Sequence, residues 1–464
     1  MPDAPKVRLR RVQIRGLFGH YNHDFELSQR DRVTILHGPN GVGKTAVLRL
    51  LYALFSGQLL RLLSVRFDTF TVAFEGNACV TIERSQGAGS AEAERVWINV
   101  VDALGLQSRR EARFENKITS VLQHVISRRA PWLTRLDDET WFDHRTDEKI
   151  SVNELLLRLE TGDTELRLDH TAVEELRPLV AVRALLQEVA NRVDVHIIET
   201  QRLLTKGKKS DRNRYRTIDE GDEEVRTTVN ECADVIKQRI GASVSNYASE
   251  SQRRDQTFPM RLLALPSTTH VDRKGLKRRL DTIGKKRKQL ADVGLLIDKS
   301  ESYAESFERL DLESADDAQL RVIELYAGDT TGKLQTLDEV LQIASIFVDQ
   351  VNSRFRHKRM MLDRQRGLIA VSDRGEAIKL DALSSGEQHQ LVLFFDLLFR
   401  VNPGSLVLID EPELSLHVLW QKTLLNSLIE IAATNGLDIL IATHSPYIVA
   451  DRMDLMRDLN SQGE

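Results

Sequence analysis

The sequence is poor in cysteine, lacks a long apolar run and carries little net charge. Cys79 and Cys232 are its only cysteines. Two cysteines are too few for a disulfide framework or a zinc site, and such low usage is typical of a reducing cytoplasm. The longest apolar stretch, residues 391–399, is interrupted by Asp396, so we expect no membrane span. Residues 1–15 are polar and basic, and we expect no secretory signal there.

The formal net charge of the 464 residues is −4, which excludes an overall positive field of the kind that attracts nucleic acid. A local basic patch stays compatible with that value. Hydrophobic residues make up 41% and charged residues 29% of the chain, the balance of a soluble globular protein. This length predicts about two to four structural units. We therefore expect a cytoplasmic protein without membrane contact.

A glycine-rich segment fits the phosphate-binding loop, in which a glycine and any four residues precede glycine, lysine and serine or threonine. Its residues are Gly38, Pro39, Asn40, Gly41, Val42, Gly43, Lys44 and Thr45. Glycines let backbone N–H groups close around phosphate oxygens where a Cβ would clash. Lys44 would reach the β- and γ-phosphates, and the Thr45 hydroxyl would ligate Mg²⁺.

The flanking residues support this interpretation. Residues 33–37 are apolar and predict a short buried strand, while the apolar spacing over residues 44–55 predicts a helix. A strand, a glycine loop and a helix N-terminus together form an anion site. We therefore predict that the chain binds a nucleoside triphosphate such as ATP.

A second run, residues 383–388, reads Leu-Ser-Ser-Gly-Glu-Gln and precedes an amphipathic helical pattern. Ser384 is a favourable N-cap, which would put Gly386 at a helix N-terminus whose dipole favours an anion. The candidate phosphate contacts of this run are Ser384, Ser385, Gly386 and Glu387.

Two more predicted strands deliver polar residues at their ends. Residues 406–409 are fully apolar and lead into Asp410 and Glu411. One carboxylate there can hold Mg²⁺, and the second can take the proton of an attacking water. Residues 439–442 lead to His444, which can donate a hydrogen bond to a γ-phosphate and so sense its presence.

The ordered set of loop, Leu-Ser-Ser-Gly-Glu-Gln run, Asp-Glu pair and histidine resembles the ABC-type ATPase heads of the SMC, RecF and OLD class. By this resemblance Lys44 and Thr45 belong to Walker A, and Asp410 is the Walker B aspartate that holds Mg²⁺. Glu411 would be the catalytic base and His444 the switch histidine.

The same resemblance assigns three further motifs. Ser384 and Gly386 match the signature serine and second glycine, while Ser385 replaces the usual first glycine. Residues 413–417 would form the D-loop. Gln201, just beyond a predicted strand at 193–199, is the candidate Q-loop residue and metal ligand, with Gln86 as second choice.

The resemblance implies an α/β fold, an ABC-type P-loop NTPase head with a mixed sheet and flanking helices, interrupted by a helical or short coiled-coil arm. We expect the head in residues 1–205 and 358–464 and the arm in 206–357. In this class the signature motif completes the ATP site of a second molecule. The implied assembly is a homodimer or higher homo-oligomer that closes on ATP and opens after hydrolysis.

Helical patterns dominate residues 108–190 and 222–357. In the second stretch we expect a break around Pro259 and Pro266 and a heptad seam from Leu334 to Phe355. Residues 273–288 carry nine lysines and arginines. They predict either a patch for nucleic acid or an acidic partner, or the solvated face of a helix, and no aromatic residues interleave to stack on bases.

Only residues 445–464 follow His444, so we expect no C-terminal nuclease domain of the OLD kind. The chain is similar to stand-alone ATPases of bacterial anti-phage systems, of the PtuA or AriA type. That similarity implies a slow ATPase switch that controls a separate effector, a nuclease or toxin. A RecF-like DNA-repair ATPase and a nucleotide-dependent scaffold with negligible turnover are the alternatives.

Overall fold

Two units make up the chain in the computed structural model, residues 1–200 with 401–464, and residues 201–400. The structure describes residues 7–85, 94–102, 105–114, 132–136, 140–151, 170–198, 228–265, 271–296, 312–414 and 416–459. The three-part division expected at residues 206 and 358 stays a prediction.

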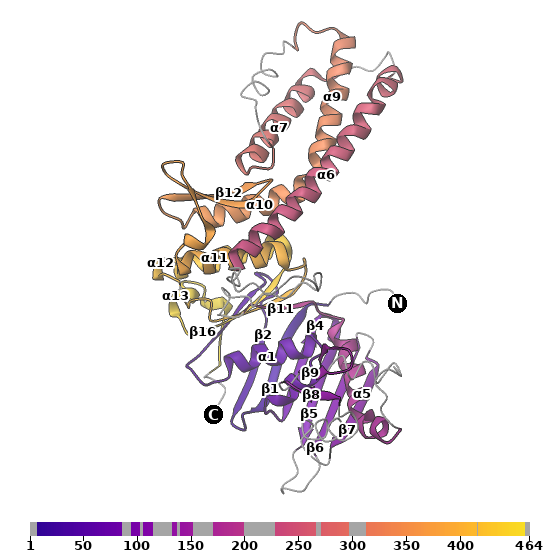
Figure 1. Cartoon of the computed structure of the whole chain (residues 1–464), viewed down its shortest axis with the longest axis vertical. Coiled ribbons are helices and arrows are strands. Elements are labelled where there is room, and N and C mark those ends of the chain that lie inside the picture. Colours follow the sequence, from indigo (N-terminus) through magenta and orange to yellow (C-terminus); the bar gives the residue numbers. More distant parts are fainter. Residues whose placement is uncertain are drawn as a thin grey trace. The chain divides into compact units, whose positions relative to one another are not determined.

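A five-stranded parallel sheet lies at the centre of the first unit, in the order β11-β15-β16-β3-β17 (Figure 1). Its strands are β3 (Val33–His37), β11 (Val195–Ile198), β15 (Leu406–Asp410), β16 (Asp438–Thr443) and β17 (Met456–Asp458). The three central strands are buried along almost their whole length, as expected for near-continuous apolar runs in a parallel sheet. The strands predicted from sequence at the phosphate loop, the Asp-Glu pair and the histidine are therefore confirmed.

Helix α1 (Lys44–Phe55) spans the residues predicted to be helical and is buried around most of its circumference. It contacts β11, β15 and β16 of the parallel sheet. Its other apolar side chains join those of the neighbouring antiparallel sheet in one core. Because a helix that is apolar on all sides must be covered on all sides, packing fixes the start of α1, where Lys44 and Thr45 lie.

The antiparallel sheet has six strands in the order β2-β1-β4-β5-β6-β7. They are β1 (Leu9–Leu17), β2 (Tyr21–Glu26), β4 (Thr69–Phe74), β5 (Cys79–Ser85), β6 (Glu94–Val101) and β7 (Gln107–Phe114). Burial alternates strictly along β4, so one face of that strand enters the core. Strands β4 and β5 form a hairpin that turns at Gly76 and Asn77, whose φ angles of 81° and 68° are left-handed.

The prediction that residues 108–190 are mostly helical is wrong for two parts that the structure describes, residues 108–114 and 133–151. Strand β7 extends into this stretch, and a three-stranded sheet follows, in the order β10-β9-β8. Its strands are β8 (Leu133–Arg135), β9 (Thr140–Asp143) and β10 (Glu148–Ser151). They are short, and only Leu133, Trp141 and Ile150 enter the core, so they leave too few apolar positions for a period of two to be recognised. Within the described part of this stretch, α5 (His170–Ala190) is helical.

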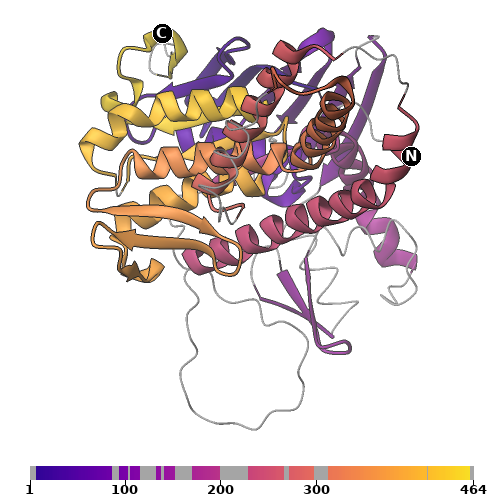
Figure 2. The same cartoon turned by 90° about the horizontal axis from the view of Figure 1, so that it is seen from above.

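The second unit is mainly helical, as predicted. Its helices include α6 (Thr228–Leu263), α7 (Arg273–Asp292), α9 (Asp317–Gln335), α10 (Asp338–Asn352) and α11 (Ser385–Phe395). A small antiparallel sheet joins β12 (Lys358–Asp363), β13 (Gly367–Ser372) and β14 (Ala377–Ile378). Figure 2 shows α6, in rose, as one continuous helix.

One detail of the arm agrees with prediction and one differs. Helix α6 passes through Pro259, where the lost backbone hydrogen bond is accommodated in its last turns, and ends at Leu263, between the two prolines around which a break was predicted. The heptad seam from Leu334 to Phe355 is shared by two helices, because α9 ends before residue 336 and α10 begins at 338. Acidic residues in the first turn of α10 favour a new helix start.

A buried carboxylate ties α6 to α9. Asp329 is 5% exposed and accepts hydrogen bonds from Arg254 at 3.3 Å and from Arg261 at 2.5 and 2.7 Å. Burial opposes ionisation, yet the two guanidinium groups outweigh it and lower the pKa of Asp329. This pairing holds the two long helices side by side.

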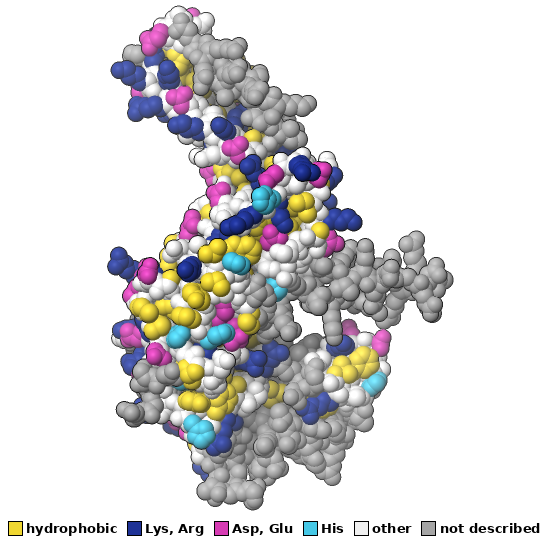
Figure 3. All heavy atoms as spheres, turned by 90° about the vertical axis from the view of Figure 1, so that its left-hand side faces the viewer, with side chains coloured by type: hydrophobic (Ala, Val, Ile, Leu, Met, Phe, Trp, Pro, Cys, Tyr) yellow, Lys and Arg dark blue, Asp and Glu magenta, His cyan; other side chains and the backbone are white. Residues whose placement is uncertain are grey.

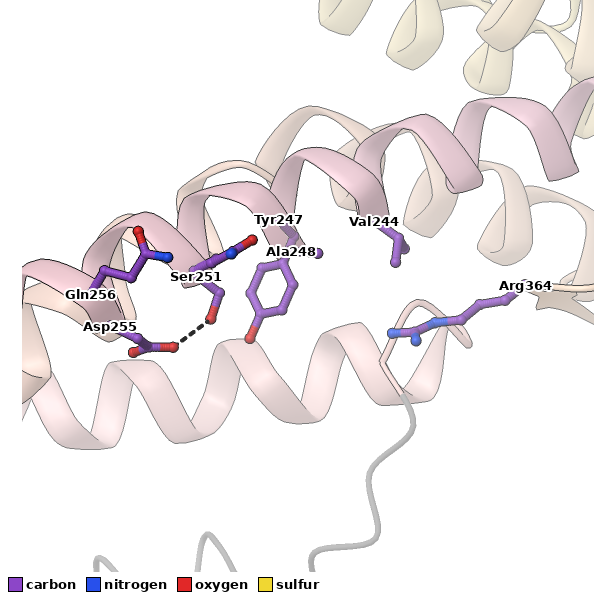
Figure 4. A pocket seen from close by; sticks show the side chains of 8 residues that line it. Val244, Tyr247, Ala248, Ser251, Asp255, Gln256 and Arg364 are labelled. Atoms are coloured by element: carbon purple, nitrogen blue, oxygen red, sulfur yellow. Dashed lines mark hydrogen bonds between the residues drawn. The ribbon is translucent and has the colours of Figure 1, made fainter.

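Figure 4 shows a shallow hollow along α6, lined by Val244, Tyr247, Ser251 and Asp255 and by Arg364 of the neighbouring hairpin. Ser251 donates a hydrogen bond to Asp255 across one helical turn, at 3.3 Å. The Arg364 guanidinium already donates to the Leu295 carbonyl. No helix in the described part of the chain is long and apolar enough to cross a bilayer.

Candidate nucleotide site

The phosphate loop leaves the carboxyl end of β3 and enters α1. Gly41 and Gly43 have φ angles of 91° and 97°, which L-residues with a side chain rarely adopt. A Cβ on Gly43 would lie 2.5 Å from Leu17 Cδ2 of β1, closer than real side-chain contacts. The loop therefore needs glycine both for its backbone shape and for its fit against the antiparallel sheet.

Lys44 is 6% exposed, and its Nζ donates to the carbonyl oxygens of Gly38 at 2.7 Å and Pro39 at 2.9 Å. Burial lowers the pKa of Lys44, and the negative charges of nearby carboxylates oppose that shift. Those carboxylates are Glu411, Glu413 and Asp410. The ammonium group is thus held over the loop by backbone oxygens, where a phosphate can replace one of them.

His23 contacts the phosphate loop, which the sequence did not reveal. It lies on β2, is 2% exposed, and its Nε2 is 2.8 Å from the Val42 carbonyl of the phosphate loop. Since a carbonyl only accepts, Nε2 carries the proton. Burial lowers the pKa of His23, which favours the neutral ring. The ring stacks on Tyr21, with centroids 6.0 Å apart, so β2 braces the loop.

Asp410, at the end of β15, faces the first turn of α1. The Thr45 hydroxyl lies 3.1 and 3.0 Å from its two carboxylate oxygens. Burial raises the pKa of Asp410, the Thr45 hydrogen bond opposes this, and the Glu411 charge adds to it. The structure therefore brings together the two side chains predicted to share Mg²⁺.

Glu411 and His444 lie at the same edge of the parallel sheet. Glu411 has a left-handed φ of 44°, and its N–H donates to the Ala442 carbonyl at 2.8 Å. Its Oε1 is 3.8 Å from His444 Nδ1, and both side chains are partly exposed. The predicted base and switch residue thus meet beside Asp410, where a γ-phosphate and water can enter.

The signature run lies in the second unit, at the start of α11. Ser384 is the N-cap, and Glu387 closes a capping box by accepting from the Ser384 N–H and hydroxyl, both at 2.9 Å. Lys358 of β12 pairs with the same carboxylate at 3.1 Å. Burial would raise the pKa of Glu387, but these hydrogen bonds and the lysine lower it overall.

Ser384 and Ser385 are exposed, whereas Glu387 is buried and engaged within its own helix start. Its contacts suit it to hold Ser384 in place, and a direct nucleotide contact by Glu387 stays a prediction. Gln201 and Gln86, the two Q-loop candidates, lie outside the described residues, as does Ser415 of the D-loop.

A family model described as "AAA domain" matches residues 11–345. The chain belongs to the AAA-domain family of ATPases. ATP binding and hydrolysis are therefore its general activity, and the predicted α/β ATPase-head fold is confirmed. A second family model, described as "AAA domain, putative AbiEii toxin, Type IV TA system", matches residues 336–450 of this AAA-domain ATPase.

Solved structures similar to this AAA-domain ATPase include an Smc head domain with an extended coiled coil, bound to the C-terminal domain of ScpA, derived from Pyrococcus furiosus. It is 13% identical, with 97% of this chain and 93% of that chain covered and a TM-score of 0.37. The Smc head domain with a coiled coil and joint from Pyrococcus yayanosii is 13% identical, with 96% of this chain and 94% of that chain covered and a TM-score of 0.31. The SMC head domain from Thermotoga maritima is 11% identical, with 96% of this chain and 92% of that chain covered and a TM-score of 0.30. Comparison with curated proteins finds no match.

Replacing His23 with alanine should weaken ATP binding about tenfold, because a buried carbonyl left unpaired costs about 1–3 kcal/mol and frees the loop. Calorimetric titration with ATP checks this. Lys44→Ala, which removes the phosphate-binding ammonium, should show no measurable binding, and His20→Ala, in the exposed neighbouring turn, should bind normally. A folded His23→Ala protein with wild-type affinity would contradict the bracing role.

Proposed function

We propose that this AAA-domain ATPase is a slow, nucleotide-driven switch whose ATP site is completed by a second copy of the chain. Lys44 and the loop N–H groups hold the phosphates, and Glu411 accepts the proton of the attacking water. His444 detects the γ-phosphate. The observation that carries the proposal is the hydrogen bond between Thr45 and Asp410, with the Glu411–His444 pair at the same sheet edge.

Mg²⁺ fits the end of β15. The ion takes few protein ligands and combines a hydroxyl or carboxylate with phosphate oxygens. Thr45 and Asp410 offer such a pair. A cation there would offset both the cost of burying the Asp410 carboxylate and its repulsion from Glu411. When bound, the ion would neutralise charge on the phosphates. Gln201 is proposed as a further ligand.

Pairing with a second copy is supported by the surface beside the site. Leu414, Val418, Leu419 and Tyr447 are each between 42% and 54% exposed, and they flank the Glu411 and His444 segments in sequence. The face seen in Figure 3 carries apolar side chains interspersed with histidines. Contiguous apolar side chains on a surface mark an interaction site. In the proposed dimer this surface meets the partner, and the exposed Ser384 and Ser385 of each copy reach the other's ATP.

We assign the output of the switch to a separate effector protein, a nuclease or toxin, in defence of a bacterial cell against phage. The support is the second family model, whose description, "putative AbiEii toxin, Type IV TA system", refers to the matched segment itself and links it to a toxin–antitoxin pair; that segment spans the signature, Asp410 and His444. The composition of the complex purified from its native operon tests the assignment. A nuclease or toxin that co-purifies supports it, and purification of the ATPase alone contradicts it.

Replacing Glu411 with glutamine should trap an ATP-bound dimer, because ATP still binds while the base that activates water is lost. Mass photometry with ATP and Mg²⁺ should show the dimer. Adding Leu414→Arg to this variant should return it to monomer through charge repulsion at the apolar surface, whereas Leu106→Arg, at an exposed leucine on a distant strand connection, should not.

An unchanged assembly state of Glu411→Gln with and without ATP would contradict the shared site. If this variant also retained full protective function in cells, the chain would act as a nucleotide-dependent scaffold without turnover.

A DNA-binding ATPase of the RecF kind is the second candidate, and α7 favours it. Five exposed cations lie on the side of α7 opposite its buried leucines and isoleucine. This basic stripe consists of Lys274, Lys277, Arg278, Lys285 and Lys288. None of the five forms an ion pair with an acidic side chain in the described part of the chain. The stripe extends about 21 Å along the helix, enough to follow several phosphates of a duplex.

Charge reversal tests the second candidate. A Lys274→Glu, Lys277→Glu, Lys285→Glu variant should lose at least tenfold in duplex affinity at low salt and show a shallower salt dependence. The matched control is Arg359→Glu, Arg366→Glu, Arg374→Glu, which makes the same charge change on exposed positions of the β12–β13–β14 sheet. Equal losses in both variants, or no duplex binding by the wild type, would reject the stripe as a nucleic-acid site.

A further inference from the structure

The hydroxyl of Ser384, the exposed serine of the signature run, is engaged by Glu387. A hydroxyl carries one proton, and this one is donated to Glu387 Oε2 at 2.9 Å. The Ser384 N–H donates to the same oxygen at 2.9 Å, and the Lys358 ammonium group donates to it at 3.1 Å. One carboxylate oxygen therefore accepts from a single serine twice and from a lysine once.

This hydroxyl must leave Glu387 before it can bind a nucleotide. A phosphate oxygen accepts hydrogen bonds, so Ser384 can hold a phosphate of the other copy's ATP only by donating the same proton. Gln388 Nε2 donates to the carbonyl oxygens of Asp381 at 3.0 Å and Leu383 at 2.9 Å, and so holds the backbone just before the serine. Rotation of the exposed serine side chain is the movement that this arrangement allows.

Release of the hydroxyl is unfavourable for Glu387 on its own. The Glu387 side chain is 9% exposed, and a buried carboxylate that loses a hydrogen bond costs free energy. Its negative charge also lies in the first turn of α11, where it opposes the attraction of the helix N-terminus for a phosphate. Lys358 offsets both effects, because its ammonium group stays paired with Oε2 while the hydroxyl leaves.

The strand that carries Lys358 is itself held in place. Lys358 begins β12 and pairs with Ser372 of β13. Asn352, the last residue of α10, donates to the Met360 carbonyl at 3.0 Å and accepts from the Met360 N–H at 2.7 Å. With this backbone fixed and its side chain 21% exposed, the lysine presents its charge to the signature.

We propose that Lys358 is a positioning residue of the signature. It neutralises Glu387 and so lets the Ser384 hydroxyl turn from that carboxylate to a phosphate of the other copy's ATP. This inference rests on the proposed function, in which two copies share each ATP site. The effect of Lys358 therefore lies in the turnover of the partner's ATP and not in ATP binding by its own phosphate loop.

Kinetics of charge variants test the role of Lys358. Lys358→Met removes the charge at similar side-chain length, and it should lower kcat at least about tenfold while the affinity for ATP stays within about twofold. Lys358→Arg keeps a cation beside the carboxylate and should retain kcat within about threefold. Arg359→Met, at the exposed neighbouring cation of β12, is the control and should leave kcat unchanged. Wild-type kcat in Lys358→Met would overturn the proposal.

A second pair of variants tests the route through Glu387. Lys358→Gln keeps an N–H donor without the charge, so it should show the same loss, and it replaces Lys358→Met if that variant fails to fold. Adding Glu387→Gln should recover kcat at least about threefold, because the carboxylate that needed a counter-charge is gone. The absence of any recovery would show that Lys358 does not act through Glu387.

Mixing of variants shows in which copy's ATP site Lys358 acts. Lys44→Ala lacks the ammonium group for its own ATP but offers an intact signature, so the mixed dimer with Lys358→Met has one complete site. Its turnover should exceed that of either variant alone at least about threefold. The reference is Lys44→Ala mixed with Ser384→Ala.

The two mixtures separate the possible failures. If the reference mixture recovers turnover and the Lys358→Met mixture does not, Lys358 acts within its own copy and this inference alone is wrong. If neither mixture recovers, the shared ATP site of the proposed function is rejected, and this inference with it.

Discussion

The hydrogen bond between Thr45 and Asp410 joins two ends of the chain that are 365 residues apart in sequence, and the rest of the site depends on it. It brings the first turn of α1 to the carboxyl end of β15, where Lys44 meets the charges of Asp410, Glu411 and Glu413. Burial raises the pKa of Asp410 and lowers that of Lys44. Both shifts disfavour the charged forms, and a phosphate group with its cation would stabilise the charged forms of both groups at once.

The fold supplies the rigidity that this arrangement needs. Helix α1 is covered by the parallel sheet and by side chains of the antiparallel sheet, so its N-terminus cannot move without disturbing both cores. Two residues of the antiparallel sheet also act on the phosphate loop. Leu17 leaves no room for a Cβ at Gly43, and His23 is hydrogen-bonded to the Val42 carbonyl. In this unit, close packing therefore holds the phosphate-binding groups in a fixed position.

Sequence patterns predicted the parts of the fold in which one signal dominates. Continuous apolar runs located β3, β15 and β16, because strands buried on both faces leave no room for polar residues. The short strands between residues 133 and 151 were missed, since three or four residues cannot establish a period. The split of the heptad at residues 336–337 has another cause: acidic residues in the first turn of α10 favour a new helix start, which a heptad pattern does not reveal.

Some site residues could likewise be predicted from the sequence and others could not. Lys44, Asp410, Glu411 and His444 sit at motif positions after glycines or strand ends, where their chemistry can be read from the sequence. The resemblance placed Glu413 in the D-loop without its hydrogen bond to the end of β16, and no motif pointed to His23 on β2, because both contacts join segments that are distant in sequence. Only the register of the folded sheets gives these residues partners.

The dependence of thermal stability on nucleotide and cation tests the central claim that Asp410 and Thr45 receive a cation together with ATP. Ligands that bind only the folded state raise the unfolding midpoint according to their affinity. We expect ATP with Mg²⁺ to raise the midpoint by several degrees, on the order of 2–4 °C per kcal/mol of binding free energy. ATP with a chelator should raise it by less than half as much, and Asp410→Asn should abolish that difference. Equal shifts with and without Mg²⁺, or an unchanged Mg²⁺-dependent shift in Asp410→Asn, would contradict the account.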